Sequence, residues 1–298
     1  MPSKPIGGIF AAATTPFAHD GTIDTAAATS NATALVASGL QGLVLVGSTG
    51  EAPVVDDGER DALLAAVRPV VPTDRWLLMG VGAESTRLTI ERARRAASLG
   101  ADAVLVVAPH YYTAAMTPRA QEAHYRAVAD ASPVPVLLYS IPQYMHFALD
   151  AETVGRLATH PNIIGIKDSG GDAVVRDSYQ TLAPAPFAVF TGHAPSLRIA
   201  LATGCEGAIL ATGCIAPALC LAIADAVNTG DEARGRALQQ ALTKLATEVA
   251  VKFGVPGLKA AVDAAGRIGG APRAPLLALD DAARGQVERV VREVLAGV

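Results

Sequence analysis

The sequence predicts an α/β protein, a (β/α)₈ TIM barrel followed by a C-terminal helical extension. Short runs rich in Val, Ile and Leu recur eight times, and stretches with helical periodicity separate them. The runs are almost continuously apolar, as in parallel strands that helices cover outside and side chains fill within. A single barrel of this class commonly spans about 250 residues. We therefore predict a barrel over residues 1–228 and a helical extension, packed on it, over residues 229–298.

The predicted strands follow one another along the chain at intervals that leave room for one helix each. They cover residues 6–12, 43–47, 76–82, 103–108, 134–140, 163–169, 187–192 and 207–212. The segment after the first strand lacks the G-x-G-x-x-G pattern of dinucleotide-binding open sheets. A closed barrel therefore fits better than a doubly wound sheet.

The intervening stretches carry helix boundaries. One helix is predicted from Asp56, and another has Ser85 as its N-cap and Gly100 just past its end. In the extension, helical patterns cover residues 233–252, 256–266 and 280–298, and Pro and Gly residues lie between the last two.

Composition excludes several classes of function. The chain has 298 residues, of which 51% are hydrophobic and 17% charged, with a net charge of −4. No basic patch points to a nucleic acid, and no apolar run reaches the ~18 residues of a membrane span. The first residues lack the apolar core of a signal peptide, so we expect a cytoplasmic protein. Three cysteines without C-x-x-C spacing indicate neither a disulfide framework nor a thiolate metal site.

Lys167 is the most informative residue for chemistry. It is one of five lysines and follows the apolar residues 163–166 at the end of a predicted strand, where barrel enzymes place their active sites. Desolvation there lowers the pKa of an amine, which allows it to attack a carbonyl and form a Schiff base. An inert ion pair with Asp168 explains the same pattern, and the residues alone leave both interpretations open.

Two other strand ends carry polar groups. Tyr139 ends the preceding strand and is placed to transfer protons, although a tyrosine there, taken alone, is more often part of the core. Ser48 and Thr49 lie between Gly47 and Gly50, where hydroxyls and backbone N–H groups suit a small carboxylate. By itself this segment is also typical of an ordinary loop.

Four short motifs at the predicted strand ends occur in a fixed order along the chain. They are Thr14-Thr15-Pro16-Phe17, Gly47-Ser48-Thr49-Gly50-Glu51, Tyr139-x-Ile141-Pro142 and Gly165-Ile166-Lys167-Asp168. Together they resemble the dihydrodipicolinate synthase and N-acetylneuraminate lyase family of class I, pyruvate-dependent aldolases. The resemblance spans essentially the whole chain and looks closest to the 4-hydroxy-2-oxoglutarate aldolase branch.

The resemblance implies catalytic roles for four residues. Lys167 matches the Schiff-base lysine, and Tyr139 matches the tyrosine that moves protons. Ser48 matches the hydroxyl that links this tyrosine into a proton relay. Tyr112 matches a relay tyrosine lent by a neighbouring subunit, although Tyr111 remains an alternative. A homodimer or homotetramer is therefore expected.

The resemblance also implies a substrate-binding set. Ser48 and Thr49 match the pyruvate carboxylate site, and the other matching positions are Ser169, Gly192 and Ile209. One position departs from the synthase pattern, because Tyr144 stands where those enzymes carry an arginine. A phenol replaces a guanidinium poorly as a carboxylate partner, so we expect a less charged pocket for the second substrate.

The predicted activity is that of a Schiff-base lyase. It releases pyruvate, or glyoxylate plus pyruvate, from a 4-hydroxy-2-oxo acid such as 4-hydroxy-2-oxoglutarate. The alternatives are 4-hydroxy-tetrahydrodipicolinate (dihydrodipicolinate) synthase and a barrel that binds a 2-oxo acid without turnover. We expect no cofactor and no metal, because the six histidines lack the paired spacings of a zinc site.

Overall fold

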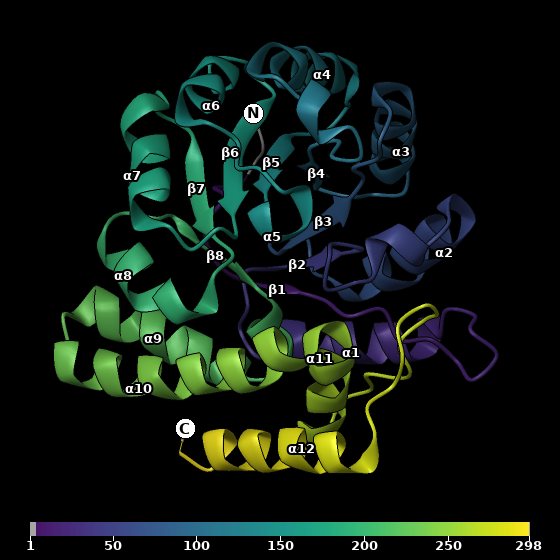
Figure 1. Ribbon diagram of the computed structural model, residues 1–298, viewed down its shortest axis with the longest axis vertical. Helices are drawn as coiled ribbons and strands as arrows, with labels where there is room; N and C mark the ends of the chain where they lie inside the picture. Colours follow the sequence, from purple (N-terminus) through teal and green to yellow (C-terminus); the bar gives the residue numbers. More distant parts are fainter. Residues whose placement is uncertain (1–3, 298) are drawn as a thin grey trace.

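A closed barrel of eight parallel strands forms the centre of the protein (Figure 1). The computed structural model describes residues 4–297, so residues 1–3 of the predicted barrel range and residue 298 of the predicted extension lie outside it. The TIM-barrel prediction is confirmed. The strands are β1 (Gly8–Ala12), β2 (Gly42–Leu45), β3 (Trp76–Gly80), β4 (Ala103–Val107), β5 (Val136–Ser140), β6 (Ile163–Asp168), β7 (Ala188–Thr191) and β8 (Gly207–Leu210).

Helices follow the strands and surround the barrel. Ser85 caps α3 (Thr86–Ser98) by accepting the N–H of Leu88, and Asp56 forms a reciprocal capping box with Glu59 at the start of α2 (Asp57–Val67). The α-helices before the extension are α1 (Thr25–Ala37), α2 (Asp57–Val67), α3 (Thr86–Ser98), α4 (Pro118–Ala131), α5 (Pro142–Met145), α6 (Ala151–Leu157), α7 (Ala173–Leu182), α8 (Leu197–Ala202) and α9 (Pro217–Thr229). Short 3₁₀ turns are η1 (Ala52–Val54), η2 (Arg68–Val70), η3 (Thr113–Ala115), η4 (Ala194–Ser196) and η5 (Ala211–Cys214).

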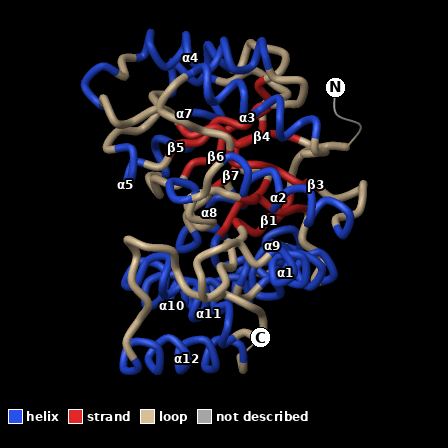
Figure 2. Tube along the Cα trace, turned by 90° about the vertical axis from the view of Figure 1, so that its right-hand side faces the viewer, coloured by secondary structure: helices blue, strands red, loops and turns tan. Residues whose placement is uncertain are grey.

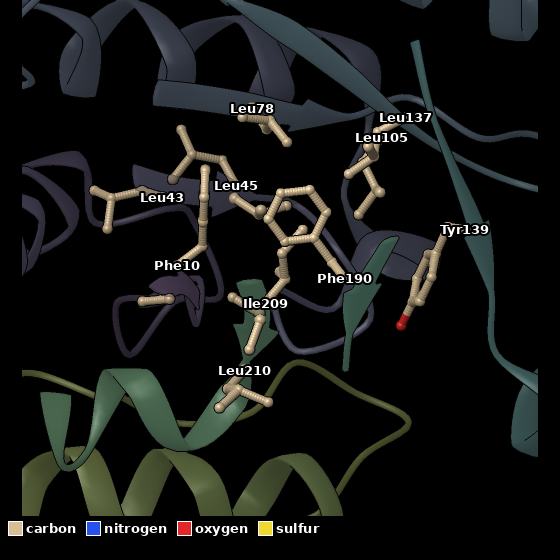
Figure 3. Packing of buried hydrophobic residues seen from close by; sticks show 14 of the residues in the cluster. Phe10, Leu43, Leu45, Leu78, Leu105, Leu137, Tyr139, Phe190, Ile209 and Leu210 are labelled. Carbon is tan, nitrogen blue, oxygen red and sulfur yellow. The ribbon is translucent and has the colours of Figure 1, made fainter. Parts of the chain in front are cut away.

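Apolar side chains fill the barrel interior (Figure 3). Phe10 of β1 and Phe190 of β7 meet edge to face at its centre, with ring centroids 5.6 Å apart. Tyr139 lies beside this cluster, and its hydroxyl is at the end of the ring away from Leu105 and Leu137. The packed core thus ends below the carboxyl ends of the strands, where a cavity begins.

The extension forms a layer of helices along one side of the barrel (Figure 2). It consists of α10 (Glu232–Leu245), the π-helical turn η6 (Ala246–Val251), α11 (Lys252–Ala264) and α12 (Asp281–Leu295). The sequence pattern predicts two separate helices before residue 266, whereas the structure continues without a loop from α10 through η6 into α11.

A kink in α11 lies just before Pro256, where the sequence pattern predicts the start of a separate helix. Gly254 has φ 58° and ψ −146°, a conformation that glycine adopts readily, and Pro256 follows two residues later. The kink changes the direction of the chain beside the carboxyl ends of the strands. None of the helices within residues 4–297 is long and apolar enough to cross a membrane.

Candidate active site

A cavity of about 360 Å³ opens at the carboxyl ends of the barrel strands. Barrel residues supply its floor and polar groups, and η6 and α11 of the extension supply one apolar wall. The predicted site residues that line it are Ser48, Thr49, Tyr139, Tyr144, Lys167, Ser169, Gly192 and Ile209. The structure therefore brings together every predicted residue except Tyr112.

Lys167 lies deep in this cavity. It is next to the last residue of β6, opposite Tyr139 of β5 in the strand register, and only 5% exposed. Its Nζ lies 4.3 Å from the centroid of the Tyr139 ring. Burial lowers the pKa of Lys167 to about 7, because the ammonium loses its water. A large fraction of the amine is then neutral, and nucleophilic, near neutral pH.

The ion pair with Asp168 that the sequence left open is not found. The salt bridges among residues 4–297 include none at Lys167. Asp168 instead accepts the N–H of Gly170 at 3.2 Å. No carboxylate of the described residues therefore keeps Lys167 protonated.

Tyr139 and Ser48 form the second part of the site. The Tyr139 Oη and the Ser48 Oγ are 3.3 Å apart, and either atom can be the donor. Burial raises the pKa of Tyr139, and the hydroxyls of Ser48 and Ser169 act against that rise. The phenol is thus neutral at physiological pH, and it can donate a proton to one neighbour while it accepts one from another.

The segment after β2 is a tight turn that holds Ser48 and Thr49 at the cavity. The N–H of Gly50 donates to the carbonyl of Gly47 at 3.0 Å, and the N–H of Glu51 donates to the carbonyl of Ser48 at 3.2 Å. Thr15 donates its hydroxyl to the carbonyl of Gly50 at 2.8 Å. None of these bonds uses the hydroxyl of Ser48 or Thr49, and both residues line the cavity.

Gly192 has a steric reason to be glycine. A Cβ there would lie 2.0 Å from the Ser169 Oγ and 2.8 Å from the Lys167 Cε. Any larger residue would displace the lysine or the serine. The close approach therefore keeps room for the side chains of Lys167 and Ser169.

The outer part of the cavity has little charge. Tyr144, in α5, is 53% exposed and lines the cavity, and no arginine of the described chain does so. Lys167 is the single lysine among the lining residues. His193 also lines it, and burial lowers its pKa, which favours the neutral imidazole.

Sequence reasoning missed His193 and the wall formed by the extension. The wall includes Val251, which is 77% exposed although apolar, and also Ala246, Ala250, Val255 and Leu258. Helical periodicity marks these residues as apolar, but it does not show which of them faces the barrel mouth. The π-helical turn and the kink at Gly254 lie among these residues and interrupt the regular helical period.

Tyr112 lies outside the cavity of the single chain. It is 71% exposed, and its ring packs edge to face on Tyr111, with centroids 5.1 Å apart. Its predicted role depends on a second subunit. Within residues 4–297, no group of three or more His, Cys, Asp or Glu side chains is placed to hold a metal ion.

Comparison with known proteins agrees with this geometry. Residues 5–294 match the dihydrodipicolinate synthetase family. 4-Hydroxy-tetrahydrodipicolinate synthase 1 of Streptomyces coelicolor is 39% identical over 281 residues, which cover 93% of this chain and 90% of the relative. The enzyme of that name from Acidothermus cellulolyticus is 38% identical over 98% of this chain and 92% of its own.

Solved structures of the same family are similar to this chain over nearly its whole length. Dihydrodipicolinate synthase from Bacillus anthracis superposes with a TM-score of 0.92 at 28% identity, covering 97% of this chain and 98% of the other. The prophage protein YagE from E. coli K12, solved in complex with pyruvate, gives 0.91 at 28% identity, covering 97% and 99%. The chain belongs to the dihydrodipicolinate synthetase family of class I, pyruvate-dependent aldolases, and it is a lyase.

Proposed function

We propose that Lys167 forms a Schiff base with pyruvate and that the resulting enamine adds to, or is released from, an aldehyde. The observation that carries this proposal is a desolvated lysine without an ion pair beside the hydrogen-bonded Tyr139 and Ser48. The neutral Nζ attacks C2 of pyruvate, and the carbonyl oxygen leaves as water. Tyr139, left as a phenolate after it protonates the departing oxygen, takes a C3 proton and so gives the enamine. The enamine C3 then bonds to the aldehyde carbon, and the aldehyde oxygen takes up a proton from Tyr139.

Within this mechanism Tyr139 moves the protons. It delivers a proton to the departing C2 oxygen and recovers one through Ser48. Ser48 and Thr49 hold the pyruvate carboxylate, and Ser169, Gly192 and Ile209 line the remaining space. The iminium supplies the electrophile, so we propose that no metal ion and no organic cofactor takes part.

The first candidate for the overall reaction is 4-hydroxy-tetrahydrodipicolinate synthase, in which pyruvate condenses with aspartate semialdehyde. It was the alternative in the sequence analysis, and the relatives with this name support it better than cleavage of 4-hydroxy-2-oxoglutarate. The reverse-aldol reaction is the second candidate. Tyr144 stands in the position of the synthase arginine, so the residues that line the outer cavity offer no cation to the carboxylate of aspartate semialdehyde. This favours the reverse-aldol reaction.

The Schiff base can be tested directly. Borohydride added with pyruvate is expected to leave a reduced adduct on Lys167, found by peptide mass mapping, and Lys167→Arg is expected to leave none.

Turnover of aspartate semialdehyde or 4-hydroxy-2-oxoglutarate, compared by kcat/KM, then separates the two candidate reactions. Activity is expected to survive exhaustive EDTA treatment. An unmodified Lys167 would refute the mechanism, and an adduct without turnover of any aldol would favour a binding protein.

The lowered pKa of Lys167 predicts a pH profile. Only the neutral amine attacks, so the initial rate of trapping by pyruvate and cyanoborohydride is expected to rise with pH through about 7 and to level off above about 8. A lysine with an ordinary pKa would gain about tenfold per pH unit up to pH ~10. A rate that continued to climb between pH 8 and 10 would contradict the desolvation of Lys167.

Tyr144 is expected to control the second substrate. Tyr144→Arg would supply a charge-assisted contact, so kcat/KM for aspartate semialdehyde should rise by about tenfold or more. Pyruvate trapping at Lys167 serves as the internal control and should change by less than about twofold. If kcat/KM with aspartate semialdehyde stayed constant, Tyr144 would not face the second substrate.

We also propose a homodimer or homotetramer in which Tyr112 completes the site of a neighbouring subunit. Sedimentation or light scattering of the active enzyme at assay concentration is expected to give at least a dimer. Tyr112→Phe should lower kcat by about tenfold or more with little effect on assembly. A fully active monomer would refute the shared site.

A further inference from the structure

The turn that carries Ser48 and Thr49 ends in a buried charge. Glu51 is the last residue of this turn, has the left-handed backbone angles φ 58° and ψ 37°, and is 2% exposed. Left-handed angles are strained for a residue with a side chain. Something outside the turn must therefore hold Glu51 in place.

The C-terminal extension supplies the partners of Glu51. The Lys259 Nζ, in α11, lies 2.6 Å from the Glu51 Oε1, and both side chains are 1% exposed. The N–H of Arg273 donates to the Glu51 Oε2 at 2.9 Å. Both carboxylate oxygens are thus bound by residues more than 200 positions further along the chain.

Lys259 is itself held on several sides. Its Nζ also donates to the carbonyl of Ala271 at 2.7 Å and lies 4.3 Å from the centroid of the Phe17 ring. Phe17 belongs to the segment after β1, so the ammonium connects two loops of the barrel mouth with the extension. Neither Glu51 nor Lys259 is among the residues that line the cavity.

A direct backbone path leads from this pair to the site. The N–H of Glu51 donates to the carbonyl of Ser48 at 3.2 Å, and the N–H of Ala52 donates to the carbonyl of Gly47 at 3.2 Å. A change in the backbone angles of Glu51 would therefore move Ser48 and Thr49. Lys167 is on another strand and would not follow.

We infer that Glu51 and Lys259 are positioning residues, a buried ion pair through which the C-terminal extension holds the Ser48–Thr49 turn in the geometry that binds the substrate carboxylate. The inference rests on the proposed function, because it assumes that this turn binds the carboxylate of pyruvate. The extension would then affect how tightly pyruvate binds before the reaction, and it would not affect the reactivity of Lys167.

The loop around Arg273 has anchors of its own. The Arg273 guanidinium bonds Glu59, with the shorter contact at 2.5 Å, and also donates to the carbonyls of Gly21 and Val54. Loss of the Lys259 ammonium would therefore take away the charged partner of Glu51, while the loop and its Arg273 N–H stay in place. This arrangement makes the pair suitable for substitution.

The test compares Lys259→Met, Glu51→Gln and the double variant Glu51→Gln/Lys259→Met. The double variant removes both charges and is expected to recover the thermal stability lost in Lys259→Met, because no unpaired charge stays buried. In all three, the pyruvate concentration for half-maximal borohydride trapping should rise by about tenfold or more. Trapping by acetone, which forms the imine without a carboxylate, should change by less than about twofold.

A surface ion pair of the same extension provides the matched control. The Lys244 Nζ and the Glu293 Oε2 lie 2.5 Å apart with both side chains exposed, and Lys244→Met should leave both trapping reactions unchanged. The inference fails if the folded double variant, or Glu51→Gln, keeps its pyruvate half-saturation near that of the wild type. It also fails if trapping by pyruvate and by acetone decline together. If the wild type itself forms no pyruvate adduct, the proposed function fails instead.

Discussion

Closure of the barrel is the constraint on which the rest of the structure depends. β1 pairs with both β2 and β8, so the carboxyl ends of all eight strands surround one axis. Residues far apart in the sequence meet there, including Ser48 after β2, Tyr139 on β5 and Lys167 on β6. The same closure removes Lys167 from water, and this desolvation lowers its pKa. Geometry and reactivity at the site thus have a common origin.

The barrel could be predicted from the sequence because each strand is buried on both faces. Such a strand is apolar at nearly every position, so its pattern does not depend on which face points inward. The strand ends could be located for the same reason, and with them the positions of Lys167, Tyr139 and Ser48. The N-cap of α3 at Ser85 could also be predicted from the sequence, because capping depends on residues only three positions apart.

Features that depend on distant contacts could not be predicted. The ion pair of Glu51 and Lys259 joins residues 208 positions apart, and neither side chain stands out in a pattern of local hydrophobicity. The wall of the cavity around Val251 depends on the π-helical turn η6 and on the kink at Gly254. Helical periodicity assumes regular turns, so it cannot show which face a helix presents after such an irregularity. The role proposed for Tyr112 depends on a second chain, which one sequence does not describe.

The ion pair between the extension and the Ser48–Thr49 turn also bears on the order in which the protein is made. Synthesis proceeds from the N-terminus, so all eight strands leave the ribosome before Lys259 does. Until then, Glu51 has neither its ammonium partner nor the N–H of Arg273, and its carboxylate stays in water. All eight strands can therefore pair before the ammonium that neutralises Glu51 has been synthesised. The contacts that fix the end of this turn thus come from the last part of the chain to be synthesised.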